Sequence, residues 1–438
     1  MGSKSLTRRD FLRLSALTAA GAALAGCGPK PTATTAPPVE PTVAPTAPPA
    51  EPITLTQVYH SYGEAGVEEA VYRYADQYHE FNPNVTVEVT WSPDINNAMN
   101  TSMAAGTGPD VYETNPGPSV EQVAQNWAAP LDDVVSADEK ADFNQVRLAR
   151  NTINGRLYAI PMCIDTGAVT YRKSMAEAAG VAEPAVLADL VANMEALNTG
   201  RVKGLFLGND SGVDGFYAEH LVFSTGTTLL TDDFKPAFAT EGVAAAMVKF
   251  REISTSDALL VGAPQDWWMP DSFTGGLCAM QEMGLWAFPA ITTAIADDWD
   301  LFIWPPAASG GKSTTFLGGW VEVVNPSSAH VAEAAALARW LWIDNAEIQE
   351  DFNLSYGFHI PPRLSVAAKA TKLQAGQAAK MVSLAQQGFW NEPAEWIGAM
   401  GTALNDAFVA IVTQGADPMP ALQTAADKVQ QELDALLG

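Results

Sequence analysis

Residues 154–173 read NGRLYAIPMCIDTGAVTYRK, the pattern of a chain that leaves one compact lobe and enters another. An Asn-Gly turn opens the stretch, and an apolar run with a single proline, Pro161, follows. Because proline cannot donate a hydrogen bond to a strand ladder, Pro161 is expected at a strand end or a sheet edge. The lone carboxylate Asp165 comes next, close to the bend between two extended segments. We therefore expect Asp165 to face a cleft.

The length and charge of the whole chain limit its number of domains and its possible partners. The 438 residues are too many for one ordinary core, so the sequence predicts two domains after its N-terminal segment. A formal net charge of −26 argues against nucleic acid as a partner, because a polyphosphate would be repelled. The composition favours a soluble protein with neutral or cationic partners.

The first 26 residues have the features of an export signal. They carry a twin arginine at Arg8 and Arg9, an apolar run over residues 14–24, and small residues before Cys27. We interpret residues 1–26 as a Tat-type lipoprotein signal peptide, with Cys27 as the acylated first residue of the mature chain. The alternative is an ordinary secretory signal followed by a chance cysteine. The apolar run is too short for a spanning helix, which favours cleavage.

Residues 27–52 follow as a segment rich in proline, threonine and alanine. Such a composition cannot bury enough apolar surface to fold, so we predict a tether with polyproline character. A lipid on Cys27 would then hold the folded part at the outer face of the cytoplasmic membrane.

The globular part begins with alternating strand and helix patterns. A strand is predicted over residues 53–60, a helix over 64–81 with Phe81 on its buried face, and an alternating strand over 85–91. A helix over 94–105 and a strand over 110–113 complete the first lobe. This order is typical of an α/β lobe with a mixed or parallel sheet.

The same alternation continues beyond Lys173 and is interrupted twice more. Residues 312–320, with Gly318 and Gly319, and residues 357–362, with a double proline, break the pattern as the opening stretch does. We interpret them as a second and a third crossing between two α/β lobes. Three crossings make an open cleft with a hinge, and such clefts close on a ligand.

Seven short motifs in order along the chain resemble the extracellular solute-binding protein family 1. This family comprises the sugar-binding receptors of ABC importers and includes maltose-binding protein. The motifs are FNPNVTV at 81–87, AGTGPDV at 105–111, PLDD at 130–133, GRLYAIP at 155–161, TYRK at 170–173, GLCAM at 276–280 and MGLW at 283–286. One departure is the family's usual Tyr-Asn-Lys, which reads Tyr171-Arg172-Lys173 here.

The resemblance implies a periplasmic-binding-protein-like α/β fold with two Rossmann-like lobes and a three-segment hinge. Lobe 1 would comprise residues 53–162 and 320–359, and lobe 2 residues 163–319 and 360–438. The resemblance also implies a monomer that binds a sugar or oligosaccharide between the lobes and delivers it to an ABC permease. Neither a cofactor nor a metal nor an enzymatic step is expected.

The resemblance assigns five positions to the ligand site. Asp165 matches a carboxylate that binds sugar hydroxyls, Trp286 a stacking aromatic, and Trp396 an aromatic of the C-terminal helices. Thr114 and Asn115 fall where the family places polar contacts of the first lobe. The tryptophan and aspartate that maltose-binding protein carries in the first lobe are absent, so maltodextrin itself is not expected.

Sugar chemistry adds four positions to these. A sugar offers apolar C–H faces and hydroxyls, so its sites combine aromatic platforms with carboxylates. Trp320 lies at the second crossing, and Trp268 belongs to a Trp267-Trp268 pair of which only one indole is expected to face the cleft. Tyr62 and Glu64 follow the first strand, at the end where open α/β sheets bind ligands. Glu64 has the alternative role of complementing a helix dipole.

Other chemistry has weak support in the sequence. No Gly-x-Ser-x-Gly elbow or complete P-loop occurs, and the five histidines lack metal-ligand spacing, so each is expected at the surface or in a satisfied core. Residues 210–215 resemble a calcium loop, but Leu221 stands where the bidentate glutamate belongs. Cys163 and Cys278 are two separate buried thiols or, alternatively, a disulfide.

The sequence therefore predicts a lipid-anchored receptor that captures a neutral sugar or oligosaccharide for an ABC importer. Three alternatives remain. A secreted glycan-acting hydrolase would need two carboxyl groups flanking one bond. A binding protein could also serve a sensor in place of a transporter, or take a cationic solute such as a polyamine.

Overall fold

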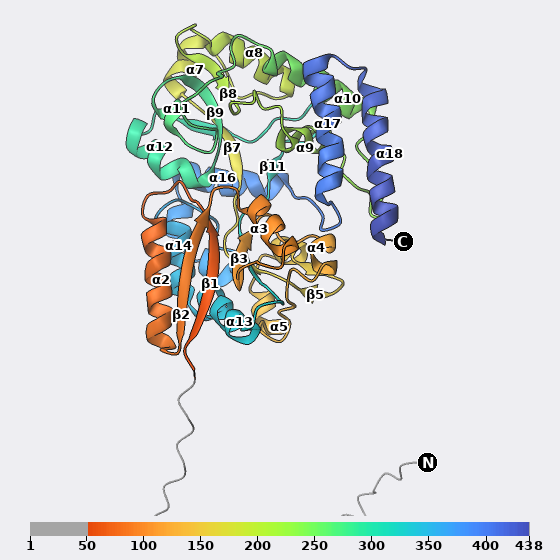
Figure 1. The fold of residues 1–438 in the computed structure, drawn as a ribbon. Helices are drawn as coiled ribbons and strands as arrows, with labels where there is room; N and C mark the ends of the chain where they lie inside the picture. Colours follow the sequence, from red (N-terminus) through yellow and green to blue (C-terminus); the bar gives the residue numbers. More distant parts are fainter. Residues whose placement is uncertain (1–50, 438) are drawn as a thin grey trace, which may run out of the picture. The chain divides into compact units, whose positions relative to one another are not determined.

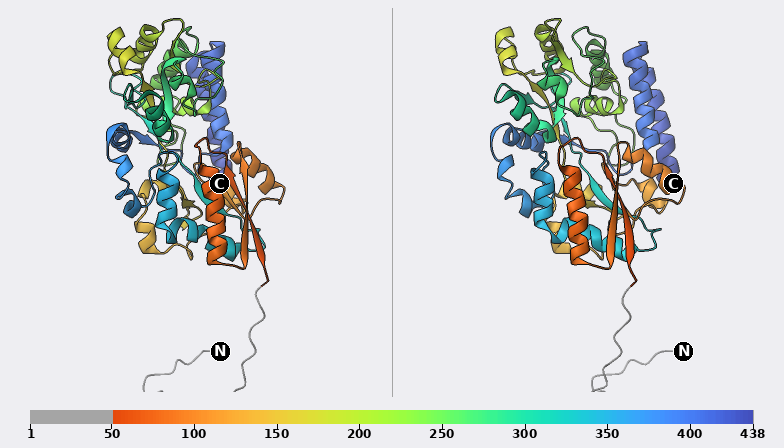
Figure 2. Two further views of the ribbon diagram at one scale, coloured as in Figure 1. Left: turned by 90° about the vertical axis from the view of Figure 1, so that its left-hand side faces the viewer. Right: turned by 60° about the vertical axis from the view of Figure 1, so that its left-hand side comes forward.

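The structure, a computed structural model, describes residues 51–437. The predicted signal peptide over residues 1–26, the lipidation site Cys27 and the predicted tether up to residue 50 lie outside the described residues. None of the helices within residues 51–437 combines the length and the apolar character that crossing a membrane requires. Figures 1 and 2 show these residues from three directions.

A five-stranded mixed sheet forms the first lobe. Its strand order is β2-β1-β3-β12-β6, and β1 is parallel to β2 and β3 whereas β12 is antiparallel to β3 and β6. Pro161 ends the edge strand, as its missing N–H group predicts. The strands are β1 (Ile53–His60), β2 (Val85–Ser92), β3 (Val111–Thr114), β6 (Ile160–Pro161) and β12 (Val321–Val324).

The predicted start and buried face of the first helix need correction. α2 begins at Val67, three residues later than predicted, because Gly66 has a φ of 95° and is not helical. Phe81, which was expected on the buried face, is 68% exposed at the last position of the helix. The other helices of this lobe and its short strands are α3 (Ile95–Ala104), α4 (Val120–Ala124), α5 (Ala137–Ala141), α6 (Gln145–Arg150), β4 (Thr152–Ile153), β5 (Arg156–Leu157), α13 (Val331–Arg339), the π-helical turn η2 (Trp340–Asp344) and α14 (Ala346–Leu354).

A second, four-stranded sheet with the order β10-β7-β9-β8 forms the core of the other lobe. β7 is antiparallel to both β9 and β10, and β8 is parallel to β9. A two-stranded pair, β11 with β13, lies apart from it. The strands are β7 (Gly167–Tyr171), β8 (Lys203–Phe206), β9 (Cys278–Gly284), β10 (Asp300–Phe302), β11 (Thr315–Phe316) and β13 (Phe389–Trp390).

Helices surround the second sheet, and the last two run side by side, as Figure 1 and the right-hand view of Figure 2 show. Val429 and Leu433 of the last helix are buried in this lobe's core with Phe408 of the helix before it. The helices are α7 (Lys173–Ala179), α8 (Leu187–Leu197), α9 (Gly215–Ser224), α10 (Glu241–Ser254), α11 (Asp271–Thr274), η1 (Leu285–Ala287), α12 (Phe288–Ile295), α15 (Leu364–Ala367), η3 (Thr371–Leu373), α16 (Gly376–Gly388), α17 (Gly398–Gln414) and α18 (Pro418–Leu437).

Each sheet is packed against its own set of buried apolar side chains. Trp342 is buried with the first sheet's helices, whereas Trp299 and Trp304 are buried beside the second sheet. Cys163 and Cys278 are both buried and free, so the two-thiol interpretation is correct for the described chain. Separate cores explain how two lobes can keep their internal packing while they move at a hinge.

The three predicted crossings are joined by backbone hydrogen bonds. Asp165 and Gly318 exchange two such bonds of 3.2 and 2.9 Å, which join the first crossing to the second. Ile164 and Ile360 exchange two bonds of 2.9 Å, which join the first crossing to the third. The first crossing, within residues 154–173, is thus hydrogen-bonded to both of the others, and the three segments form the predicted hinge.

Candidate ligand-binding cleft

A cavity of about 520 Å³ lies beside the three crossings. Residues that follow β1, β2 and β3 contribute to its wall, and so do α9, the loop before α11 and η1. Its lining residues are His60, Ser61, Tyr62, Gly63, Glu64, Pro93, Asn115, Pro116, Asp165, Phe216, Trp267, Trp268, Trp286, Phe316, Leu317, Gly318, Trp320, His359, Trp390, Asn391 and Glu392.

Aromatic side chains of the second lobe form one wall of the cavity. The ring of Phe216 stacks on Trp267 with centroids 5.5 Å apart and an angle of 16° between the planes. The ring centroid of Trp267 lies 6.1 Å from the centroids of both Trp268 and Trp286. The indole Nε1 of Trp286 donates to the carbonyl oxygen of Trp268 at 2.9 Å, which fixes the two residues relative to each other. This wall offers several apolar faces to a ligand.

Tyr62, His60 and Trp320 line the cavity on the side of the first lobe. The rings of His60 and Trp320 stack with centroids 4.4 Å apart and an interplanar angle of 16°. The hydroxyl of Tyr62 donates to Oε1 of Glu113 at 2.8 Å. Burial raises the pKa of Tyr62 well above its ordinary value, so this phenol stays neutral and its hydroxyl remains a donor.

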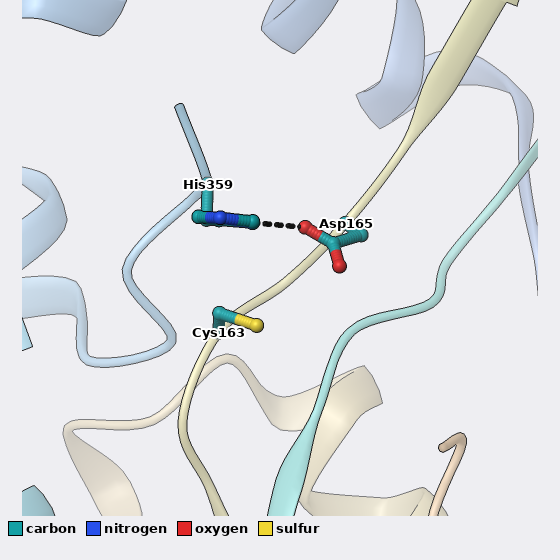
Figure 3. Close-up of side chains that lie close together, drawn as sticks. All are labelled: Cys163, Asp165 and His359. Atoms are coloured by element: carbon teal, nitrogen blue, oxygen red, sulfur yellow. Dashed lines mark hydrogen bonds and ion pairs between the residues drawn. The ribbon is translucent and has the colours of Figure 1, made fainter. Parts of the chain in front are cut away.

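His359 holds the two carboxylates that the sequence placed in the cleft. Its Nδ1 lies 2.5 Å from Oδ1 of Asp165, and its Nε2 lies 3.2 Å from Oε1 of Glu64. Figure 3 shows the ring extending from the third crossing toward Asp165. Burial alone would lower the pKa of His359, but the charge and hydrogen bonds of Asp165, Cys163 and Glu64 raise it well above its ordinary value. His359 is therefore an imidazolium between two carboxylates.

A metal ion does not fit between the two central groups of this cluster. Candidate ligand atoms of Cys163, Asp165 and His359 lie within 4.8 Å of one another. However, the 2.5 Å contact between Asp165 and His359 is that of a direct ion pair and leaves no space for an ion between those atoms. Burial raises the pKa of Cys163 to about 11, so its sulfur is a neutral thiol and a poor metal ligand. The cluster is best described as an ion pair that joins the first crossing to the third.

Seven of the nine predicted contact positions line this cavity, namely Tyr62, Glu64, Asn115, Asp165, Trp268, Trp286 and Trp320. Glu64 lies before α2, and its side chain contacts His359. Thr114 is absent from the lining. It is the buried last residue of β3, which extends one residue further than predicted, and its hydroxyl donates to Asn96 at 3.1 Å. Trp396 is buried as well and lines an adjoining cavity.

Several lining residues were missed by the sequence analysis. Trp267 lines the cavity together with Trp268, contrary to expectation, because the two rings are nearly perpendicular at 84° and meet it with different surfaces. His359 was assigned only a surface or core role. Its position within the predicted third crossing was the signal that could have identified it.

The sequence that resembled a calcium loop has a structural role. Oδ1 of Asp210 accepts a hydrogen bond from the backbone N–H of Gly212 at 2.9 Å. Oδ1 of Asp214 accepts from the N–H of Tyr217 at 3.1 Å and caps the N-terminus of α9. Both carboxylates are thus used in a turn and a helix cap.

Comparison with known proteins agrees with this architecture. A binding protein of Brucella abortus (strain 2308) is 25% identical over 184 residues, which cover 39% of this chain and 43% of that protein. The ABC transporter solute-binding protein of Thermotoga lettingae TMO, bound with α-D-tagatose, has a TM-score of 0.75 at 20% identity and covers 87% of this chain and 99% of its own. The GacH receptor of Streptomyces glaucescens GLA.O, solved unliganded and with acarbose, has a TM-score of 0.74 at 20% identity and the same coverage.

These structures share the two-lobe α/β fold with this chain, which confirms the predicted fold class. The sequence evidence is more specific about the family. Residues 73–380, more than half of the chain, match the profile of a single family, and the protein therefore belongs to the bacterial extracellular solute-binding proteins.

Proposed function

We propose that the protein is the binding component of an ABC importer and that its cleft captures a sugar or an oligosaccharide. The observation that carries this proposal is an aromatic wall, Trp267, Trp268 and Trp286, in the same cavity as the carboxylates of Asp165 and Glu64. Indole faces stack on the C–H faces of a sugar ring, and carboxylates accept hydrogen bonds from its hydroxyls. A cavity of about 520 Å³ is in the usual range for small-molecule sites.

The proposed ligand contacts are the seven cavity residues Tyr62, Glu64, Asn115, Asp165, Trp268, Trp286 and Trp320, to which the geometry adds Trp267 and His359. The ligand would bridge the lobes and favour the conformation in which both walls contact it. We place the lobe boundaries at 53–162 with 320–359, and at 163–319 with 360–438. The hydrogen bonds of Ile164 to Ile360 and of Asp165 to Gly318 support these positions.

The arrangement of the carboxylates favours binding over hydrolysis. A glycan hydrolase needs one protonated carboxyl group and one free carboxylate on either side of the scissile bond. Here Asp165 and Glu64 both contact the same imidazolium, His359, which holds them on one side. The proposed function therefore includes no covalent step.

The proposal also covers where the protein acts. With a lipid on Cys27 and a tether up to residue 52, a monomeric receptor would be held at the outer face of the cytoplasmic membrane. From there it would present its bound ligand to the permease subunits of the importer.

Tryptophan fluorescence and calorimetric titration test the proposal directly. We expect a saturable response to at least one member of a panel of mono- and oligosaccharides, because five indoles line the cleft. Incubation of the same sugar with purified protein should leave it chemically unchanged when it is analysed by chromatography. A response to peptides or amino acids with none to any saccharide would refute the sugar assignment, and turnover would refute the binding-only function.

A further inference from the structure

A second chamber adjoins the main cavity at its second-lobe wall. It has a volume of about 390 Å³. Phe216, Trp390 and Glu392 line both cavities, so the chamber directly adjoins the cleft. Trp396, which the sequence analysis assigned to the ligand site, lines only the chamber. The two cavities therefore share part of their walls.

Two carboxyl groups meet in this chamber. Glu219 is 5% exposed, and its Oε1 accepts a hydrogen bond from Nε1 of Trp396 at 3.1 Å. Burial and the neighbouring Glu392 raise the pKa of Glu219 well above its ordinary value, and burial likewise raises that of Glu392. Two adjacent carboxylates repel each other in a site of low polarity. A cation placed beside them would relieve that repulsion.

The chamber itself supplies no such cation. Among the residues that line it there is no lysine, arginine or histidine. The arginine that acts on Glu392, Arg150, donates instead to the carbonyl oxygens of Pro118 and Gly117 at 2.9 and 3.2 Å. Any cation inside the chamber would therefore be supplied by a ligand.

The remaining wall suits an ammonium group. Phe216, Trp390 and Trp396 present aromatic rings, whose faces attract cations. Oδ1 of Asn405, a further acceptor in the lining, is buried and has no hydrogen-bond partner within residues 51–437. An ammonium group offers three N–H donors and no acceptor, which matches two carboxyl groups and one amide oxygen. A neutral hydroxyl would satisfy fewer of these acceptors and would leave the carboxyl groups unbalanced.

We propose that the chamber formed by Glu219, Glu392 and Trp396 binds a protonated amino group, so that the ligand is an amino sugar whose rings lie in the main cleft. This inference rests on the proposed sugar-binding function. It replaces the neutral sugar of the sequence analysis by a cationic one. It also gives Trp396 a role, as the partner that orients the Glu219 carboxylate.

The test compares ligands that carry an amino group with ligands that lack one. Isothermal titration at neutral pH would use a disaccharide of glucosamine, its N-acetylated form, the neutral disaccharide of glucose, and spermidine. We expect the glucosamine disaccharide to bind at least about tenfold more tightly than the two neutral sugars, because a desolvated cation–aromatic contact and charge-assisted hydrogen bonds are gained. Its affinity should fall with added salt, whereas the affinities of the neutral sugars should not.

Variants then assign the effect to the chamber. Glu219→Gln should reduce the preference for the amino sugar to about twofold and leave neutral-sugar binding unchanged, since it keeps the shape and removes the acid that can ionise beside an ammonium group. Glu392→Gln tests the same point at a less buried position if the first variant is unstable. Glu395→Gln, three residues further along and outside both cavities, is the matched control and should keep the full preference.

The outcomes separate this inference from the proposed function. Equal or tighter binding of the neutral sugars would overturn the inference and leave the sugar-binding function intact. Binding of spermidine without any sugar would refute the sugar-binding function while supporting amine recognition by the chamber. Full preference retained in both Glu219→Gln and Glu392→Gln would place the amine elsewhere and overturn the inference.

Discussion

Nδ1 of His359 lies 2.5 Å from Oδ1 of Asp165, so the third crossing is joined to the first by a buried ion pair as well as by backbone hydrogen bonds. The other ring nitrogen contacts Glu64, which follows β1. One side chain thus links the hinge to the first lobe at the edge of the cleft. A change at His359 should affect stability and binding together.

His359→Gln should lower the free energy of unfolding by about 3–5 kcal/mol, because it removes the cation between two buried carboxylates. Urea denaturation measures this loss, and titration with the identified ligand should show weaker binding. Adding Asp165→Asn to the same protein should restore part of the stability, since one unpaired charge is removed. His330→Gln, a half-buried histidine outside the cleft, should have little effect. Unchanged stability of His359→Gln would show that the ion pair of His359 with Asp165 contributes little to the free energy of unfolding.

Trp286→Ala should weaken ligand binding about tenfold, the equivalent of about 1.4 kcal/mol, because one stacking face of the cleft is lost. Its indole also positions Trp268 through the 2.9 Å hydrogen bond, so the aromatic wall would loosen. Calorimetric titration gives the affinity, and circular dichroism checks the fold. The matched control is Trp340→Ala. Trp340 packs against Tyr78 in the first lobe and lines neither cavity. Equal losses in the two variants would contradict the assignment of Trp286.

Gly319→Ala should destabilise the hinge more than Gly262→Ala. Both glycines have a left-handed φ, 107° and 70°, so an alanine costs about 1 kcal/mol at either position. A Cβ atom at Gly319 would also lie 2.4 Å from the carbonyl oxygen of Cys163 and 2.8 Å from the nitrogen of Asp165, whereas one at Gly262 meets nothing within 4 Å. Thermal unfolding should therefore give a clearly lower Tm for Gly319→Ala. Matching Tm values would mean that the crossings can separate without cost.

Glu282→Gln should change how stability depends on pH. Burial raises the pKa of Glu282 to about 8, and burial lowers that of its neighbour His220 to about 3, so both are neutral in the folded protein at pH 7. The unfolded glutamate ionises near its ordinary pKa of 4.5. Unfolding therefore releases a proton, and this group lowers the stability by up to about 4 kcal/mol as the pH rises from about 5 to about 8.

A glutamine at position 282 resembles the protonated acid and cannot ionise, so this part of the pH dependence should vanish in the variant. Urea denaturation at several pH values measures the difference. Glu252→Gln, at an exposed position of α10, serves as the control and should keep the wild-type slope. A slope that persists in Glu282→Gln would assign it to other buried acids, of which Glu322 has a pKa raised to about 7 by burial.

Local features of the sequence predicted the elements and the crossings with little error. The alternation in β1 and the proline at the end of β6 specify backbone hydrogen bonding directly, so Ile53–His60 and Pro161 lie where expected. Errors occurred where a neighbouring turn determines where a helix begins or how its end is packed. Gly66 delays the start of α2, and Phe81 at the end of that helix lies against Tyr78 and Trp340 but remains 68% exposed.

The ligand site was predictable only in part. Asp165 and Trp286 could be identified because they adjoin motifs with a family likeness, and both line the cleft. The partners of these residues come from other segments. Nothing in the local sequence around His359 indicates that it lies between Asp165 and Glu64, nearly 200 and 300 residues away along the chain.

The sequence by itself determined the two-lobe α/β architecture and the family, because hydrophobic periodicity, turn residues and ordered motifs act over short distances along the chain. Only the tertiary structure decided how charges are paired. It brought His359 to Asp165 and placed Glu219 and Glu392 in the wall of one chamber. The reason is physical, since the energy of a buried charge depends on which atoms surround it in space. Residues 154–173 illustrate both contributions. Their local pattern predicted the first crossing, and the tertiary structure supplied the charged partner of Asp165.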